Sequence, residues 1–371
     1  MSPALFSPLR FRSLTARNRI MVSPMCQYSA PEAVPHEWHL VHLGSRAIGG
    51  AGIVMTEATA VCPEGRITPH DVGLWNDEQE SSFARIASFV AAQGALPGMQ
   101  LGHAGRKASH ARPWEGRAPL TPSEGGWQTV APGPEPWAPG GLIPRALDRD
   151  GIVAVVEAFR HSARRSLRAG FRVLEIHAAH GYLLHQFLSP LSNRRMDEYG
   201  GPWENRVRLL LECVAAVRSV WPEELPLFIR ISASDWIDGG WTIADSVILG
   251  RRLKGVGVDL IDCSSGGASP AQQIPIEPHY QVGFAARIRR ESGIATGAVG
   301  LIGEAVAANA IIAEGDADLV ILGRRLLWDP YWPLHAAKRL GEVPALPIQY
   351  ARADIFPIAI PQRKGSELAS A

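Results

Sequence analysis

The chain has 371 residues, of which 46% are hydrophobic and 20% charged, and its formal net charge is +1. This balance is ordinary for a globular protein and excludes an electrostatic grip on nucleic acid or on an anionic membrane surface. No run of about 18 apolar residues is present, so we expect no membrane-spanning helix. The arginine-rich N-terminus lacks the apolar region of a secretory signal, and the four cysteines form no Cys-x-x-Cys pair. We therefore expect a reduced, cytoplasmic location.

Short apolar runs rich in Val and Ile recur along the chain. They are residues 19–25, 52–58, 97–103, 172–179, 225–232, 258–264, 293–299 and 318–323. Continuous runs of this kind are typical of parallel strands that are covered on both faces. Parallel neighbours need crossover helices, so eight such repeats predict a single (β/α)8 TIM barrel of the α/β class. An open doubly wound sheet is the alternative, but no glycine-rich fingerprint follows the first strand.

Amphipathic segments lie between most of these runs. Between the third and fourth, Ile152, Val155 and Phe159 follow the spacing of one helical face, and Gly170 is placed to end the helix. A further helix is expected to begin at Glu204. These two helices would cover the outside of the barrel.

One connection is abnormally long. After the third strand, residues 103–150 are dense in Pro, Gly and Trp. Loops of this length are uncommon and are usually functional, so we expect a lid over the barrel mouth rather than a simple surface excursion. We assign residues 1–355 to one barrel domain, and residues 356–371 to a tail that is partly disordered or lies at a subunit interface.

In this fold the chemistry lies at the C-terminal ends of the strands. Those ends and the residues just beyond them carry, in chain order, Ser23, Pro24, Met25, Cys26, Tyr28, Ala58, Gln100, Lys107, His177, His180, Tyr182, Arg230, Gly300, Gly323 and Arg324. Glycines after the last two strands would let backbone N–H groups approach a phosphate, and Arg324 would add a bidentate contact. Gln100 and Arg230 lie inside otherwise aliphatic strands, and a buried guanidinium needs a partner. The set predicts a planar, phosphate-bearing ligand.

Simpler interpretations exist for several of these residues. The glycines would also suit tight strand-to-helix turns, Cys26 would also suit a small buried hydrophobe, and Lys107 would also suit a solvated surface. His177 and His180 could be structural, or they could bind a metal. No carboxylate or third histidine stands at a metal-binding spacing from them, so we expect no metal.

Taken together, these residues resemble a known family. The segments "NRIMVSPMCQYS", "TEATAVCPEGRI", "GMQLGHAGRKA", "EIHAAHGYLLHQFLSPLSNRRMDEYGG", "IRISASDW", "VDLIDCSSGG", "ATGAVG" and "ADLVILGRRLLWDP" are similar to those of the old yellow enzymes. The resemblance extends from residue 5 to about residue 352 and is greatest to the short-chain, thermophilic-like class of FMN-dependent ene-reductases. "HAAHGYLLHQFLSPLSNRR" is its most specific single segment.

The resemblance implies roles for individual residues. FMN would be bound non-covalently by Ser23, Pro24, Met25, Cys26, Ala58, Gln100, Arg230, Gly300, Gly323 and Arg324. The substrate would contact Tyr28, Lys107, His177, His180, Tyr182 and, from a neighbouring subunit, Arg352. His177 and His180 would hydrogen-bond its carbonyl oxygen, and Tyr182 would donate a proton. The reach of Arg352 implies a homodimer or a homotetramer.

The reaction implied is the reduction of FMN by NADPH or NADH, followed by hydride transfer to an electron-poor alkene such as an enone, a maleimide or a nitroalkene. Departures from the family pattern are Trp328, the longer Trp-rich loop and the extended tail, which bear on substrate shape and subunit contact. The longer family branch of dienoyl-CoA reductases and amine dehydrogenases is excluded, because its iron–sulfur cysteine cluster is missing from the sequence. A metal-dependent barrel hydrolase and a non-catalytic flavin-binding protein are the remaining alternatives.

Overall fold

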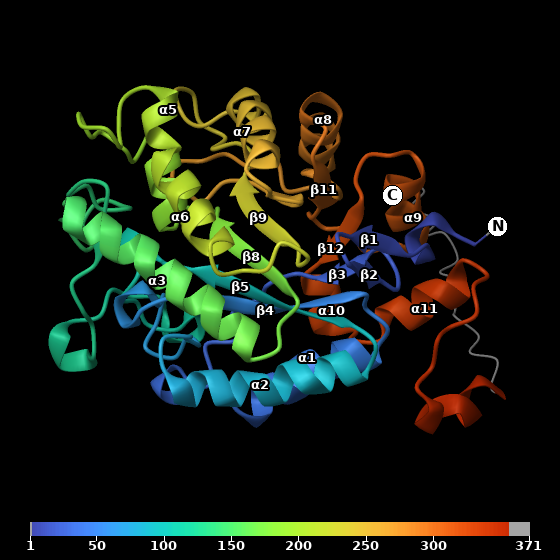
Figure 1. Cartoon of the computed structure of the whole chain (residues 1–371). Coiled ribbons are helices and arrows are strands. Elements are labelled where there is room, and N and C mark those ends of the chain that lie inside the picture. Colours follow the sequence, from blue (N-terminus) through green and yellow to red (C-terminus); the bar gives the residue numbers. More distant parts are fainter. Residues whose placement is uncertain (1, 356–371) are drawn as a thin grey trace, which may run out of the picture.

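The computed structural model describes residues 2–355, and within them eight parallel strands close into a barrel (Figure 1). The strands are β3 (Ile20–Val22), β4 (Ile53–Ala60), β5 (Leu96–Gly102), β8 (Val173–Ala178), β9 (Leu227–Ser232), β10 (Leu260–Ser264), β11 (Ala295–Ala298) and β12 (Leu319–Leu322). The closure runs through the pairing of β12 with β3, where Val320 faces Ile20. The predicted (β/α)8 barrel is confirmed, and the open sheet is excluded.

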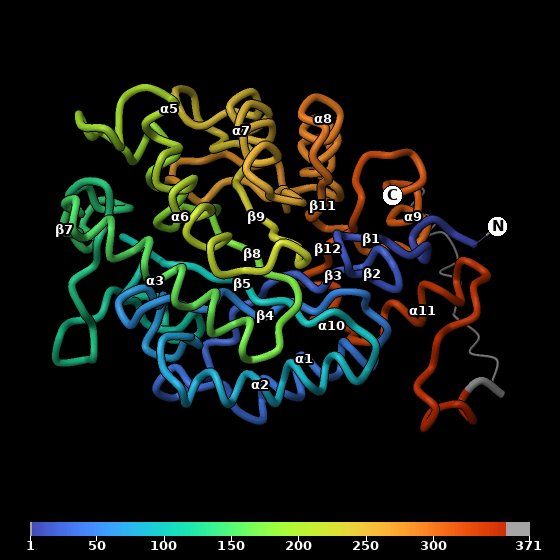
Figure 2. Tube along the Cα trace, in the orientation of Figure 1, coloured from blue at the N-terminus to red at the C-terminus, as the bar shows by residue number. Residues whose placement is uncertain are grey.

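Helices surround the barrel and pack against its outer face (Figures 1 and 2). They are α1 (Glu37–Ile48), α2 (Asp77–Ala92), α3 (Arg149–Arg168), α4 (Leu183–Leu188), α5 (Trp203–Arg206), α6 (Arg208–Arg218), α7 (Ile243–Gly255), α8 (Val282–Ser292), α9 (Ala305–Ala313), α10 (Arg324–Trp328) and α11 (Trp332–Arg339). The larger hydrophobic core lies between these helices and the strands. No helix within residues 2–355 combines the length and the apolar character needed to cross a membrane.

The predicted helix before the fourth barrel strand is α3. Its first turn is capped by Asp148, which accepts a hydrogen bond of 2.8 Å from the backbone N–H of Gly151. Ile152 and Phe159 are fully buried on its inner face. Truncating a buried Phe costs about 3–5 kcal/mol, so this face holds α3 firmly to the barrel. The chain leaves the helix at Gly170, whose φ of +90° suits glycine.

The helix expected to begin at Glu204 is in two parts. A short helix, α5, ends at Arg206, and α6 begins at Arg208 after a break at Val207. Both parts pack against α4, the helix that follows the fourth barrel strand. The break therefore lies near α4, the helix that directly follows Tyr182.

A hairpin closes the N-terminal end of the barrel. Strands β1 (Leu9–Phe11) and β2 (Leu14–Ala16) pair antiparallel, and neither was predicted. Phe11 packs edge-on against Phe228, with ring centroids 4.9 Å apart. These residues belong to a second core inside the barrel, formed mainly by the first residues of the strands. We call this hairpin and the core beneath it the barrel plug.

The long segment after β5 is mostly irregular and contains the two-residue strands β6 (Val130–Ala131) and β7 (Arg145–Ala146) and the 3-10 turns η4 (Gly105–Lys107), η5 (Pro113–Glu115) and η6 (Pro122–Glu124). Figure 2 traces it past β7 to the start of α3. Two tryptophans attach it to the barrel mouth. Trp127 Nε1 donates to the carbonyl of Glu64, and Trp137 Nε1 donates to the carbonyl of Gly267, at 2.9 and 3.0 Å. That this segment acts as a lid stays a prediction.

Candidate active site

The C-terminal ends of the strands surround a cavity of about 450 Å³. Among its lining residues are Ser23, His180, Arg230, Ser264, Tyr280, Gln281, Gly300, Gly323, Arg324 and Trp328. Most of these residues lie at or just after strand ends that are far apart in the sequence, whereas Tyr280 and Gln281 precede α8 and Trp328 ends α10. Several of them were predicted to act together. The volume lies within the range of about 300–1,000 Å³ that is common for small-molecule sites. We call this space the large cavity.

Arg230 lies at the base of the large cavity and is almost fully buried. Its Nε donates to Asp262 Oδ2 at 2.7 Å, and its Nη2 donates to Ser23 Oγ at 2.8 Å. We inferred a ligand partly from this guanidinium's need for a partner, and that step was wrong, because Asp262 supplies the partner. The guanidinium nevertheless remains on the cavity wall, with its position fixed.

A second buried carboxylate holds Gln100. The Nε2 of Gln100 donates to Glu175 Oε1 at 2.7 Å, and Glu175 Oε2 has no hydrogen-bond partner among the described residues. Burial, together with the charge of Asp262, raises the pKa of Glu175 to about 8, so this carboxyl is largely protonated at neutral pH. Sequence reasoning missed Glu175 and Asp262. Both interrupt aliphatic strands in the same way as Arg230, and that signal could have found them.

The fourth barrel strand ends in two imidazoles that contact each other. The Nδ1 of His177 accepts from the backbone N–H of Ala179 at 3.1 Å, which leaves the proton on Nε2. That Nε2 lies 3.2 Å from His180 Nδ1, and His180 Nε2 lies 2.6 Å from Ser264 Oγ. Burial holds the pKa of both histidines well below the usual range. Two neutral imidazoles therefore form a chain that ends on Ser264.

The backbone of His180 has a conformation that few residues adopt. Its φ is +60°, in the left-handed region that is costly for a side chain other than glycine. Two bonds hold it there. Its N–H donates to Ser232 Oγ at 2.8 Å, and its carbonyl accepts from Lys107 Nζ at 2.7 Å. Ser232 in turn donates to the carbonyl of Gly266 at 2.7 Å.

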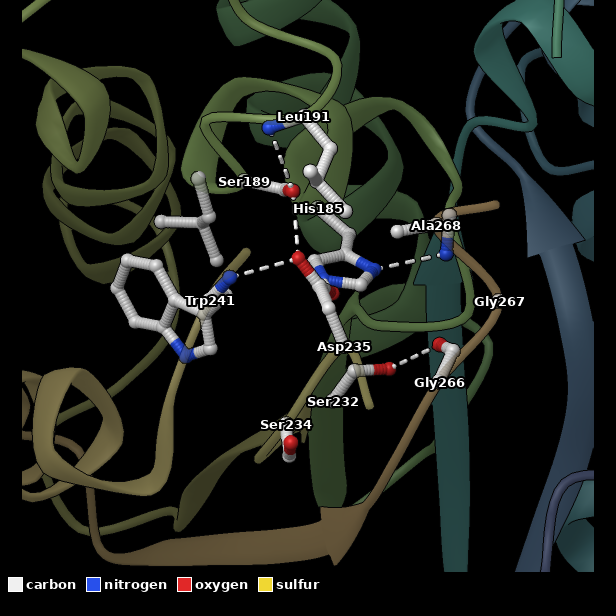
Figure 3. A network of polar contacts seen from close by, with 12 residues as sticks. His185, Ser189, Leu191, Ser232, Ser234, Asp235, Trp241, Gly266, Gly267 and Ala268 are labelled. Atoms are coloured by element: carbon white, nitrogen blue, oxygen red, sulfur yellow. Dashed lines mark hydrogen bonds and ion pairs between the residues drawn. The ribbon is translucent and has the colours of Figure 1, made fainter. Parts of the chain in front are cut away.

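A buried polar network around His185 and Asp235 contacts the loop that follows His180 (Figure 3). His185 Nδ1 accepts from the backbone N–H of Gly181 at 2.8 Å, and His185 Nε2 lies 2.9 Å from Asp235 Oδ1. The other carboxylate oxygen of Asp235 accepts from Ser189 Oγ and from the backbone N–H of Trp241, at 2.6 and 2.7 Å. The network ties the loop between His177 and α4 to the segment after β9.

Gly181 and Gly267 allow two loops to touch through their backbones. A Cβ on Gly181 would lie 1.9 Å from the carbonyl oxygen of Gly267, and a Cβ on Gly267 would lie 2.3 Å from the carbonyl carbon of His180. Both glycines have positive φ. Any side chain at either position would push the His180 loop away from the loop after β10.

Tyr182 is the residue before α4 and faces a second space, of about 200 Å³, which we call the small cavity. Its lining residues are Tyr28, Ile67, Thr68, Lys107, His110, Ala111, Pro113, Arg117, Trp137 and Tyr182. Burial raises the pKa of Tyr182 above its ordinary value, so the phenol keeps its proton at neutral pH. The ring of His177 lies 5.1 Å from that of Tyr182, edge to face. Sequence reasoning missed Trp137 and Arg117, since both lie within a segment that has no regular structure.

Lys107 lies between these elements. Besides His180, its Nζ donates to the carbonyl of Gly267 at 3.3 Å, and it lies 4.9 and 5.1 Å from the ring centroids of Trp137 and Tyr182. Burial lowers the pKa of Lys107 to about 8. The interpretation of Lys107 as a solvated surface charge was therefore wrong.

The other predicted residues are placed less centrally. Cys26 and Ala58 are not among the described residues that line the two cavities, and Ala58 borders a narrow gap of about 10 Å³ beside His177 and Tyr182. Burial raises the pKa of Cys26 well above its usual range, so it is a thiol rather than a thiolate. Pro24, Met25 and Gln100 also lie outside both linings, and Arg352 is exposed on η7 (Ile348–Ile355). The contribution of these residues to ligand binding stays a prediction.

Comparison with known proteins gives the same family as the residues. The family model described as the NADH:flavin oxidoreductase / NADH oxidase family matches residues 4–342. The NADPH dehydrogenase of Geobacillus thermodenitrificans is 48% identical over 95% of this chain and 99% of its own length. The NADPH dehydrogenase of Bacillus subtilis is 45% identical, with the same two coverages.

Solved structures agree. Morphinone reductase in complex with tetrahydroNAD superposes with a TM-score of 0.75, at 31% identity over 93% of each chain. The old yellow enzyme homologue from Zymomonas mobilis superposes with a TM-score of 0.76, at 27% identity over 91% of this chain and 93% of that one. The metal-dependent hydrolase is thereby excluded. The chain belongs to the NADH:flavin oxidoreductase / NADH oxidase family and is an FMN-dependent NAD(P)H oxidoreductase of the old yellow enzyme type.

Proposed function

We propose that this oxidoreductase reduces alkenes that are conjugated to a carbonyl or nitro group, such as enones, maleimides and nitroalkenes. The observation that carries the proposal is the loop from His177 to Tyr182. It presents two neutral imidazoles beside a protonated phenol, between the large and the small cavity.

The large cavity fits FMN. Arg324 lies at its rim together with Gly300 and Gly323, and this end offers a guanidinium and close backbone approach to a phosphate. At the other end, Arg230 is held in place by Asp262 and Ser23 and offers a fixed positive charge to a ring. When bound, FMN supplies the hydride, taken from NAD(P)H and delivered to the alkene.

Within this proposal, His177 and His180 bind the oxygen conjugated to the alkene. Negative charge develops on that oxygen as the alkene is reduced, and a donor aimed at such an oxygen contributes about 3–4 kcal/mol. The proton on His177 Nε2 now faces His180, and His180 Nε2 faces Ser264. His180 must therefore leave Ser264 before both imidazoles can donate to one substrate oxygen.

Tyr182 donates the proton to the α-carbon. Its raised pKa keeps the phenol protonated at neutral pH. Because Tyr182 lines the small cavity and the flavin would occupy the large one, the proton and the hydride would reach the alkene from different sides. Lys107, 5.1 Å from the Tyr182 ring centroid, positions the phenol. The lid and Tyr28 then limit the size of the substrate, because both contribute to the same cavity.

The exposed Arg352 is the residue through which we propose contact with a second subunit, in a homodimer or a homotetramer. Its side chain extends from η7, which lies after the last helix of the barrel. An Arg352→Ala variant that keeps the oligomer but raises the KM for enones would support this placement.

The double variant His177→Ala with His180→Ala tests the function. It is expected to nearly abolish the reduction of cyclohexenone by the reduced enzyme, because no donor remains for the developing charge. FMN should remain bound, with its yellow absorbance, because the phosphate end of the cavity is untouched. Retained turnover of the enone in a variant with full FMN content would contradict the proposal.

A further inference from the structure

A cluster of three potential metal ligands lies outside the two cavities. Cys62 Sγ, a carboxylate oxygen of Glu64 and a ring nitrogen of His103 all lie within 4.8 Å of one another. Cys62 and Glu64 come from the turn at η3 (Pro63–Gly65), and His103 follows β5 directly. The turn and the strand end are joined by the backbone bond from Ala104 N–H to the carbonyl of Gly65, at 2.8 Å.

His103 is the buried member of the cluster, with 3% of its surface exposed. Its Nδ1 accepts from the backbone N–H of Gly105 at 3.0 Å, so Nε2 carries the proton of the neutral ring. That Nε2 has no hydrogen-bond partner among the described residues. A buried, unpaired ring nitrogen costs free energy, and a metal ion that replaces its proton would remove this cost.

Gly65 leaves room between the sulfur and the imidazole. A Cβ on Gly65 would lie 3.1 Å from Cδ2 of His103 and 3.3 Å from Cys62 Sγ. Cγ of His103 would lie 3.3 Å away as well, so this edge of the imidazole and the sulfur both face the side of Gly65 that a Cβ would occupy. The arrangement is open because residue 65 carries no side chain.

The set of donors selects the metal. One sulfur, one imidazole nitrogen and one carboxylate oxygen suit Zn²⁺, which binds such ligands tetrahedrally and often leaves the fourth position to water. Tetrahedral bonds of about 2.0–2.3 Å place zinc ligands roughly 3.3–3.8 Å apart, so ligand atoms that now lie up to 4.8 Å apart would move closer on binding. Glu64 is exposed and can make this adjustment. We propose that Cys62, Glu64 and His103 form a site for one Zn²⁺ ion.

The residues around the proposed zinc site are held in place by other contacts. Arg66 donates to the carbonyls of Pro63 and Pro69 and lies 5.0 Å from the ring centroid of Trp127, so its charge is bound by oxygen atoms and an indole face. Trp127 also bonds the carbonyl of Glu64. The site is thus built on a turn that the lid holds against the barrel.

Zinc binding is tested on the FMN-loaded enzyme, freed of metal with a chelator and titrated with Zn²⁺ by calorimetry. We expect one ion per chain, and at least a tenfold weaker affinity in Cys62→Ser and in Glu64→Ala. Glu124→Gln, which changes an exposed glutamate of the lid, should bind like the wild type. Co²⁺ provides a second measurement, since tetrahedral Co²⁺ absorbs at longer wavelengths than oxidised flavin.

Two controls separate this site from the active site. Cys26→Ser removes the other half-buried thiol and should leave zinc binding unchanged. Gly65→Ala keeps all three ligands but places a methyl group between two of them, and it should weaken binding while FMN content stays full. Equal zinc affinity in the wild type and Cys62→Ser, loss of binding in Cys26→Ser alone, or no binding by the wild type would each overturn the proposal.

Discussion

Lys107 Nζ donates to the carbonyl oxygen of His180 at 2.7 Å, and this bond joins the segment after the third barrel strand to the loop after the fourth. The loop contains the left-handed His180, whose conformation needs outside support. We therefore propose that Lys107 positions the imidazole and the adjacent Tyr182.

Replacing Lys107 by methionine tests this role. Lys107→Met keeps an unbranched side chain as far as Cε but loses both carbonyl bonds and the contact of the ammonium group with the aromatic rings. We expect kcat for enone reduction to fall about 10- to 100-fold, because small displacements of catalytic groups have effects of this size. Reduction of FMN by NADPH should change little. Steady-state rates and stopped-flow traces at 450 nm, near the maximum of oxidised flavin, would measure both.

The same lysine predicts a pH dependence. Its pKa of about 8 lies below the ordinary value of 10.5, because burial disfavours the charge. Enone reduction should decline as the pH rises through about 8, and Lys107→Met should lack this decline. Between pH 8 and pH 10.5, Lys107 is protonated in the unfolded chain and largely deprotonated in the folded one. Its contribution to the free energy of unfolding therefore rises with pH over this range. An unchanged alkaline limb in Lys107→Met would assign the titration to another group.

Tyr182→Phe removes the proposed proton donor and keeps the ring. We expect alkene reduction to slow by roughly 10²- to 10⁴-fold, the range for general acid catalysis. FMN reduction by NADPH should be almost unaffected. Rapid-mixing experiments on the two half-reactions separate these effects, and equal slowing of both would count against a role in proton transfer.

Ser232→Ala removes the hydroxyl that accepts from His180 and donates to Gly266. Two buried backbone groups lose their partner, and each such loss costs about 1–3 kcal/mol. We expect a lower free energy of unfolding and a kcat/KM for enones that falls by about tenfold. Ser166→Ala, at a buried serine on α3, is the matched control and should keep full activity. If both variants lose activity equally, Ser232 has no special role in positioning His180.

Asp235→Asn tests the network behind the loop. Burial alone would raise the pKa of Asp235, but His185 and the other hydrogen-bond partners lower it below the ordinary value of 3.8. The ionised carboxylate therefore stabilises the fold at pH values above 3.8. That contribution is lost as the pH falls through the lowered folded value. At neutral pH we expect the variant to lose about 1–3 kcal/mol, since the buried Nε2–H of His185 loses its charged acceptor. Urea unfolding across the pH range should show the difference between the two proteins shrinking in acid.

The eight barrel strands were predictable because parallel strands buried on both faces leave continuous apolar runs. The β1–β2 hairpin was not, because three-residue strands such as Leu9–Phe11 leave no period long enough to detect. The helix expected at Glu204 is present but is divided into two at Val207. The division could not be predicted, because no proline or glycine stands at the break.

The site was predictable to the extent that polar residues stood out against apolar strands. Arg230 and the His177 loop were found in this way, and residues such as Arg230, Arg324 and Gly300 do meet around one cavity. Their partners were not among the predicted residues, although Asp262 and Glu175 also interrupt aliphatic strands, in the middle of β10 and of β8. Trp137 could not be placed, since its position depends on how an irregular segment of more than forty residues crosses the mouth.

The barrel plug has a consequence for the entry of substrates and the release of products. Phe11 and Phe228 fill the interior at the N-terminal end, so the barrel has no second exit there. Under the proposed reaction, NAD(P)H and the alkene would both reach the large cavity from the C-terminal end of the barrel and bind there in turn. A product that dissociates slowly would then delay binding of the next nicotinamide, and an excess of alkene would compete with it.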